Sequence, residues 1–201
     1  VIDVLEALGQ LRTAYTNLVD IFTDVKDLGD TEAVEVALAD EKKREQFYNL
    51  LCAFGRALNL VLNSEQAYAA LPGEERKKYQ DRFVFFSKVR RSVKIRYCDA
   101  IDNSEYEPLM QNLLDTHLSV AGLKQITNPV DILNKDDFER ELEELGSLRA
   151  KADAITSRLS KSISAKYEEN PAYYDSFSKR IKDALDQYKE KVISEAEYLA
   201  K

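Results

Sequence analysis

Apolar side chains recur at steps of three and four residues along most of this chain, and that spacing constrains the fold more than any other feature. It places them on one face of an α-helix, where they can pack against other helices. No alternation typical of β-strands accompanies it. We therefore predict an all-α fold, with helices over about 5–25, 31–40, 41–63, 74–98, 104–121, 136–145, 148–167 and 171–192.

Residues at the ends of these stretches set the expected helix boundaries. Glu74 and Glu75 begin one helix, because carboxylates complement the positive end of a helix dipole. Ser104 opens another helix, with Glu107 as its partner in a capping box. Pro171 suits the first turn of the last helix.

The longest non-helical stretch surrounds Asn128 and Pro129, because a residue before proline disfavours the α region. Short connections elsewhere favour a bundle of about six to eight helices. We expect one α-helical unit over 1–201, with a soft division at about 122–135.

The composition is that of a folded protein, with 44% hydrophobic and 32% charged residues among 201. No apolar run approaches the roughly 20 residues needed to cross a bilayer, so we expect no membrane association. The chain starts at Val1 and enters an amphipathic pattern directly, so we expect a piece of a longer chain without a signal peptide. Cys52 and Cys98 lie in apolar helical stretches, which favours buried free thiols and a cytoplasmic location.

Residues that could perform catalysis or bind a cofactor are sparse. His117 is the single histidine and lies beside an apolar stripe, so we expect a core or interface residue. One His and two Cys do not complete a usual zinc site, and the isolated glycines form no phosphate loop. The acidic run over 136–144 lacks the turn glycine of a calcium loop and is expected to be a solvated helix face. We predict no catalytic, cofactor-binding or metal-binding residue here.

One basic helix lies between two acidic blocks. Residues 74–98 carry 9 basic and 3 acidic side chains, a balance of +6, whereas 1–48 and 99–146 have balances of −6 and −9. The cations either pair with those blocks or form a ridge along the phosphates of duplex DNA, without base readout. The candidate DNA-backbone residues are Arg82, Lys88, Arg90, Arg91, Lys94 and Arg96.

In several stretches the order of the residues is more informative than the composition. The two longest in the first half are FYNLLCAFGRALNLVLN (Phe47–Asn63) and DRFVFFSKVRRSVKIRY (Asp81–Tyr97). HLSVAGLKQITNPVDIL (His117–Leu133) and NPAYYDSFSKRI (Asn170–Ile181) follow, with Phe138–Leu142 and Ala150–Ile155 between them. In this order they resemble the C-terminal region of the R subunit of type I restriction-modification enzymes. The resemblance covers most of the chain and is loosest over the first 40 residues.

This resemblance implies a parent subunit that is an ATP-driven DNA translocase and endonuclease, with ATP and Mg bound in other domains. It also implies that the helical end docks onto the motor domains of the same chain and onto the methyltransferase core of M and S subunits. We therefore expect a non-catalytic assembly module, with duplex DNA as a further candidate partner. The alternative interpretation is a stand-alone α-helical module that binds DNA or protein.

Overall fold

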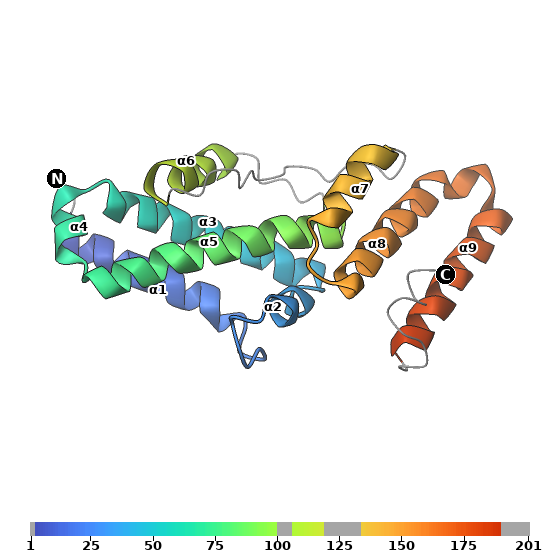
Figure 1. Ribbon diagram of the computed structural model, residues 1–201, viewed down its shortest axis with the longest axis horizontal. Coiled ribbons are helices and arrows are strands. Elements are labelled where there is room, and N and C mark those ends of the chain that lie inside the picture. Colours follow the sequence, from blue (N-terminus) through green and yellow to red (C-terminus); the bar gives the residue numbers. More distant parts are fainter. Residues whose placement is uncertain (1–2, 100–105, 119–133, 190–201) are drawn as a thin grey trace. The chain divides into compact units, whose positions relative to one another are not determined.

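The computed structural model describes residues 3–99, 106–118 and 134–189, and within these ranges every regular element is a helix (Figure 1). The prediction of an all-α fold is therefore confirmed. In chain order the α-helices are α1 (Val4–Asp20), α2 (Thr31–Ala37), α3 (Glu41–Leu62), α4 (Glu65–Ala70), α5 (Gly73–Arg96), α6 (Glu107–His117), α7 (Lys135–Glu143), α8 (Leu148–Lys166) and α9 (Pro171–Lys189). A short 3-10 helix, η2 (Tyr167–Glu169), lies between α8 and α9.

The start of the chain departs from the predicted boundaries in two places. Helix α1 ends at Asp20 and a turn follows, so Phe22 and Val25 lie outside the helix although they continue its apolar spacing. Helix α4 was not predicted, because six residues are too few to show a period. Ser64 begins it by accepting a hydrogen bond from the backbone N–H of Ala67.

Helix α6 begins two residues later than the capping-box pattern predicts. Tyr106 is its N-cap and makes no side-chain cap bond, so Glu107 occupies the first helical position and Pro108 the second. A capping-box carboxylate would have to be at the third helical position, so Glu107 does not form a box with the N-cap of α6. Ser104 itself lies outside the described residues.

The chain divides into two compact units. Unit 1 comprises Val1–Arg91 and Ile101–Thr127, and unit 2 comprises Ser92–Ala100 and Asn128–Lys201. Helix α5 thus contributes residues to both. The soft division expected at about 122–135 lies outside the described residues except for its last two positions, and it stays a prediction.

Unit 1 has an aromatic core formed by α1, α3, α5 and the turn after α1. Phe22 stacks on Phe86 with ring centroids 5.7 Å apart, and Phe47 meets both rings edge-on. Phe54 packs against Phe83 at 6.0 Å. All five side chains are almost completely buried, and each such burial contributes about 1.5–3 kcal/mol.

Close packing of α3 on α5 depends on Gly55. A Cβ at this position would lie 2.8 Å from Cε2 of Phe83, well inside van der Waals contact. Any larger residue would therefore push the ring or the helix away.

Unit 2 has smaller buried side chains. Its helix α8 buries three alanines, Ala150, Ala152 and Ala154, and only Ile163 as a large aliphatic residue. Phe138 and Leu145, on and just after α7, complete the buried apolar set among the residues described outside α8 and α5. Most of these buried apolar side chains are smaller than the aromatic rings buried in unit 1.

The two cysteines are buried and free, as predicted. Cys52 lies on α3 in unit 1, with its Sγ 3.9 Å from Sδ of Met110 on α6. Cys98 lies in the turn just after α5, in unit 2, and has a left-handed φ of 49°. The backbone N–H of Asp99 then donates to the carbonyl of Lys94, which satisfies one of the last carbonyls of the helix.

Candidate interaction site

The cations predicted to form a ridge on α5 are mostly inside the protein. Arg90, Lys94 and Arg96 are fully buried, so the expectation of a surface ridge is wrong for these three. Arg82 and Arg91 are half-buried, and Lys88 alone among the six candidates is exposed. The sequence prediction assumed that the helix packs on one face only. In the second half of α5, buried side chains lie on several faces of the helix.

Arg90 pairs with the acidic block that follows α5 in the sequence. Its Nη2 donates to Oε1 of Glu107 at 2.5 Å, and its guanidinium lies 5.6 Å from the centre of the Tyr48 ring. For this residue the structure supports internal pairing, which is one of the two interpretations left open by the sequence. Arg82 likewise donates inward, to the carbonyl of Leu28.

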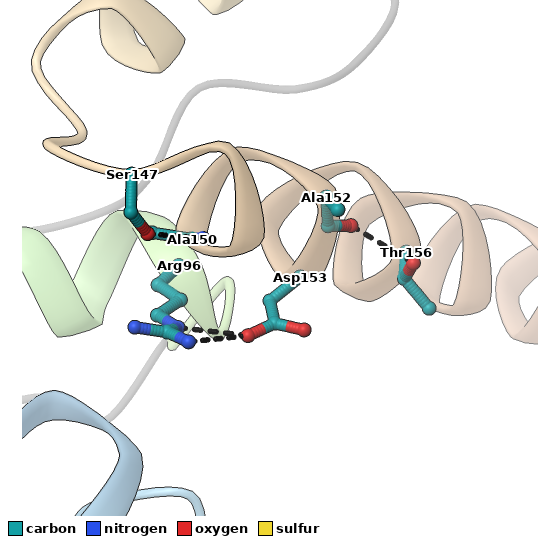
Figure 2. A network of polar contacts seen from close by, with 6 residues as sticks. All are labelled: Arg96, Ser147, Ala150, Ala152, Asp153 and Thr156. Atoms are coloured by element: carbon teal, nitrogen blue, oxygen red, sulfur yellow. Dashed lines mark hydrogen bonds and ion pairs between the residues drawn. The ribbon is translucent and has the colours of Figure 1, made fainter. Parts of the chain in front are cut away.

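Arg96 joins the end of α5 to α8 within unit 2. Figure 2 shows its guanidinium facing Asp153, and both Nε and Nη2 donate to Oδ2 of that residue, at 2.9 and 2.6 Å. The start of α8 lies beside this pair and is capped by Ser147, which accepts a hydrogen bond from the backbone N–H of Ala150 at 2.9 Å. Further along α8, Lys161 donates to the carbonyl of Cys98.

A second ion pair in unit 2 is buried on both sides. Arg158 on α8 donates through Nη2 to Oε2 of Glu141 on α7 at 2.5 Å, and its guanidinium lies 5.2 Å from the Phe138 ring. Glu141 belongs to the acidic run over 136–144, which was expected to be a solvated face. That expectation fails for Glu141, because the carboxylate is needed to neutralise the buried Arg158.

A shallow groove of about 460 Å³ lies between α1 and α3 in unit 1. Its lining residues are Asn17, Asp20, Ile21, Lys43, Gln46 and Leu50. The ammonium of Lys43 donates to Asp24 at 3.3 Å. The groove is therefore lined by amide, charged and aliphatic groups. These six lining residues do not place a nucleophile beside a base.

Helix α9 is the feature that sequence reasoning missed. None of its described side chains is buried, although it is 19 residues long and amphipathic. Its inward-facing residues Tyr174, Phe177 and Ile181 are only half-buried, and Tyr173 is 53% exposed. The apolar spacing predicted a packed face but gave no sign of how much of that face the rest of the unit covers.

Comparison with known proteins identifies the kind of protein to which this domain belongs. Residues 14–201 match a protein family described as "Type I restriction enzyme HindI endonuclease subunit-like, C-terminal". This chain belongs to that family. The resemblance noted in the sequence is thereby confirmed, and the chain is the C-terminal domain of a type I restriction enzyme endonuclease subunit. No curated protein and no solved structure matches it.

Three further sequence predictions concern the single histidine, a metal site and a membrane crossing. His117 is the last residue of α6 and is half-buried. Across the described ranges, no three His, Cys, Asp or Glu residues are grouped so as to hold a metal ion. Within the same ranges, no helix combines the length and apolar character that a membrane crossing requires.

Proposed function

We propose that this domain is a non-catalytic assembly module that couples the endonuclease subunit to the methyltransferase core of M and S subunits. The observation that carries the proposal is the incomplete burial of α9. A long amphipathic helix with a half-exposed apolar face is typical of a surface that another protein covers. Within its own unit, α9 packs against α8 and η2.

The buried charges support a structural rather than a catalytic role. Arg90, Arg96 and Arg158 each face a carboxylate that neutralises them, so these groups hold helices together. ATP and Mg would bind in other domains of the parent subunit, where translocation and cleavage would occur. The two free thiols support a reducing, cytoplasmic setting.

Deleting α9 onward from the full-length endonuclease subunit tests this proposal. The shortened subunit, ending at Glu169, should no longer co-purify with the M and S subunits. Circular dichroism and thermal unfolding should show that unit 1 stays folded, because its aromatic core contains no residue from α9. Normal assembly of the shortened subunit would refute the proposed role.

Contact with the DNA backbone is a second proposal, limited to the surface of α5. Lys88 is exposed and Arg91 half-buried, so these two side chains are the part of the predicted ridge that duplex DNA could reach. Replacing both by Glu should weaken DNA binding equally for all sequences and lower the salt slope by up to about 0.9 per lost phosphate contact. An unchanged affinity and slope would end this proposal.

A further inference from the structure

The end of α5 is buried on every side of the helix. Four consecutive residues have no exposed surface: Val93, Lys94, Ile95 and Arg96. Consecutive helical side chains are about 100° apart, so these four point in all directions around the helix axis. They belong to unit 2, whereas the helix up to Arg91 belongs to unit 1. One continuous helix therefore contributes buried side chains to two separate units.

Helix α8 holds the end of α5 through charged side chains. Nε and Nη2 of Arg96 donate to Oδ2 of Asp153 at 2.9 and 2.6 Å, and Nζ of Lys161 donates to the carbonyl of Cys98. The left-handed φ of Cys98 is unfavourable for a residue with a Cβ. Contacts with α8 therefore stabilise a turn that is unfavourable by itself.

The sequence at the end of α5 does not favour a helix without such contacts. Ser92, Val93 and Ile95 are weaker helix formers than alanine or leucine. Arg90 and Lys94 are four residues apart, where like charges on a helix are unfavourable. Short helical segments without packing partners are only marginally stable in water. The helical conformation of this segment therefore depends on the packing of unit 2.

We propose that α5 opens in two steps, with the break at about Ser92. Its end unfolds together with α8, and with α7, which the pair of Arg158 and Glu141 joins to α8. Its first part stays helical, because Phe83 and Phe86 belong to the aromatic core of unit 1. The domain thus has a partly open state in which unit 1 keeps its fold and unit 2 is released from the end of α5.

Hydrogen exchange of the full 201-residue chain at low urea concentrations tests this proposal. Amides inside a helix exchange only when the helix opens, and their rates report the unit that opens. The amides of Ile95 and Arg96 should exchange at rates that rise with urea as those of α8 do. The amides of Phe83 and Phe86 should stay protected until unit 1 unfolds.

Two substitutions act on unit 2 from different helices. Ile95→Ala removes a buried aliphatic side chain and should accelerate exchange of the Arg96 and α8 amides at least about 30-fold. Asp153→Asn weakens the hydrogen bonds from Arg96 and should accelerate the same amides at least about 10-fold. Asp137→Asn is the matched control, because its pair with Arg140 is exposed and its loss should change the rates by less than about threefold.

Three outcomes would overturn the proposal. If the substitutions accelerate α8 but leave the Arg96 amide at its wild-type rate, the end of α5 is helical without unit 2. If the Phe83 and Phe86 amides accelerate by the same factor, α5 opens in one step. If both Ile95→Ala and Asp153→Asn leave the α8 amides unchanged, the end of α5 does not hold α8 in place.

Discussion

The two units of this domain are stabilised by different kinds of side chain. Unit 1 buries a cluster of aromatic rings, among them Phe47, Phe54 and Phe86, around a close helix contact. Unit 2 buries smaller apolar side chains, among them Ala152, Val93 and Ile95, and the guanidinium groups of two ion pairs, whereas unit 1 also buries the guanidinium of Arg90 in an ion pair. The last helix of unit 2 has no buried side chain among those described. The first arrangement gains its stability from apolar area removed from water.

The second arrangement gains less from burial and more from the fit of charged groups. A buried ion pair adds little net stability, because desolvation offsets most of its attraction, but losing one partner is costly. Unit 2 should therefore be the more easily unfolded of the two. It should also be the more sensitive to single charge-removing substitutions. Unit 1 should instead respond to changes of volume.

The strongest test of this difference is Arg158→Met. It removes the guanidinium that faces the buried carboxylate of Glu141, which should lower the free energy of unfolding of unit 2 by about 3–5 kcal/mol. Hydrogen exchange of the α7 and α8 amides in urea would measure the loss. Arg140→Ala is the control, because its pair with Asp137 is exposed and should contribute less than about 1 kcal/mol. Equal losses would contradict the special role of the buried pair.

A change of volume should have its effect in unit 1. Gly55→Ala should lower the free energy of unfolding by about 1–3 kcal/mol, because the new Cβ meets the Phe83 ring at 2.8 Å. Gly9→Ala should raise it by about 0.5–1 kcal/mol, since alanine suits a helix interior better and no atom outside α1 lies within 4 Å. Urea denaturation followed by circular dichroism measures both. The two substitutions must change the free energy of unfolding in opposite directions, and equal signs would contradict the close contact at Gly55.

A capping substitution probes unit 2 without touching its charges. Ser147→Ala removes the acceptor for the Ala150 N–H at the start of α8 and should cost about 1 kcal/mol. Ser164→Ala on the same helix is the control. Its hydroxyl donates to the carbonyl of Ser160 at an exposed site, so its removal should change the thermal midpoint little. A cap effect no larger than that of the control would show that α8 is held by packing alone.

The effect expected at Tyr79 in unit 1 is a change of stability at alkaline pH. Burial, followed by a 2.8 Å hydrogen bond to Glu75, raises the pKa of Tyr79 to about 12. Between about pH 10 and 12 the folded chain keeps a proton that the unfolded chain has lost, so the free energy of unfolding should fall as the pH rises through this range.

Tyr79→Phe should remove that alkaline slope while costing about 0.5–1.5 kcal/mol at pH 7 for the lost hydrogen bond. Urea denaturation at a series of pH values would measure both quantities. Tyr68→Phe, at an exposed ring, should leave the slope in place. If the Tyr79→Phe variant keeps the wild-type slope, the proton is held by another group.

Most of the helices could be predicted, because helix formation depends on residues three and four positions apart. Two further caps could have been read from the sequence but were not predicted: Asp40 and Ser147 precede α3 and α8 with side chains suited to that position. Which face is buried was less predictable. Leu5 fits the period of α1 and is 82% exposed, whereas Lys94 lies on the predicted outer side of α5 and is buried. Exposure depends on which other elements meet a helix, and that is a non-local property.

The same limit applies to the candidate site. The spacing of Tyr174, Phe177 and Ile181 predicted an inward face on α9 but not the incomplete cover over it. Likewise, the excess of cations over 74–98 was visible, while their carboxylate partners Glu107 and Asp153 lie far along the chain. A charge balance by segment cannot show pairing over such separations. It therefore left DNA contact and internal pairing as equal interpretations.

The placement of the two cysteines provides a natural pair of reporters. Cys52 is in unit 1 and Cys98 in unit 2, and both thiols are shielded from solvent. A thiol reagent can reach each one only when the surrounding unit opens. The two modification rates therefore report the opening of the two units separately. Mass spectrometry of the labelled peptides would measure both modification rates in one sample of the wild-type protein. We expect Cys98 to react first.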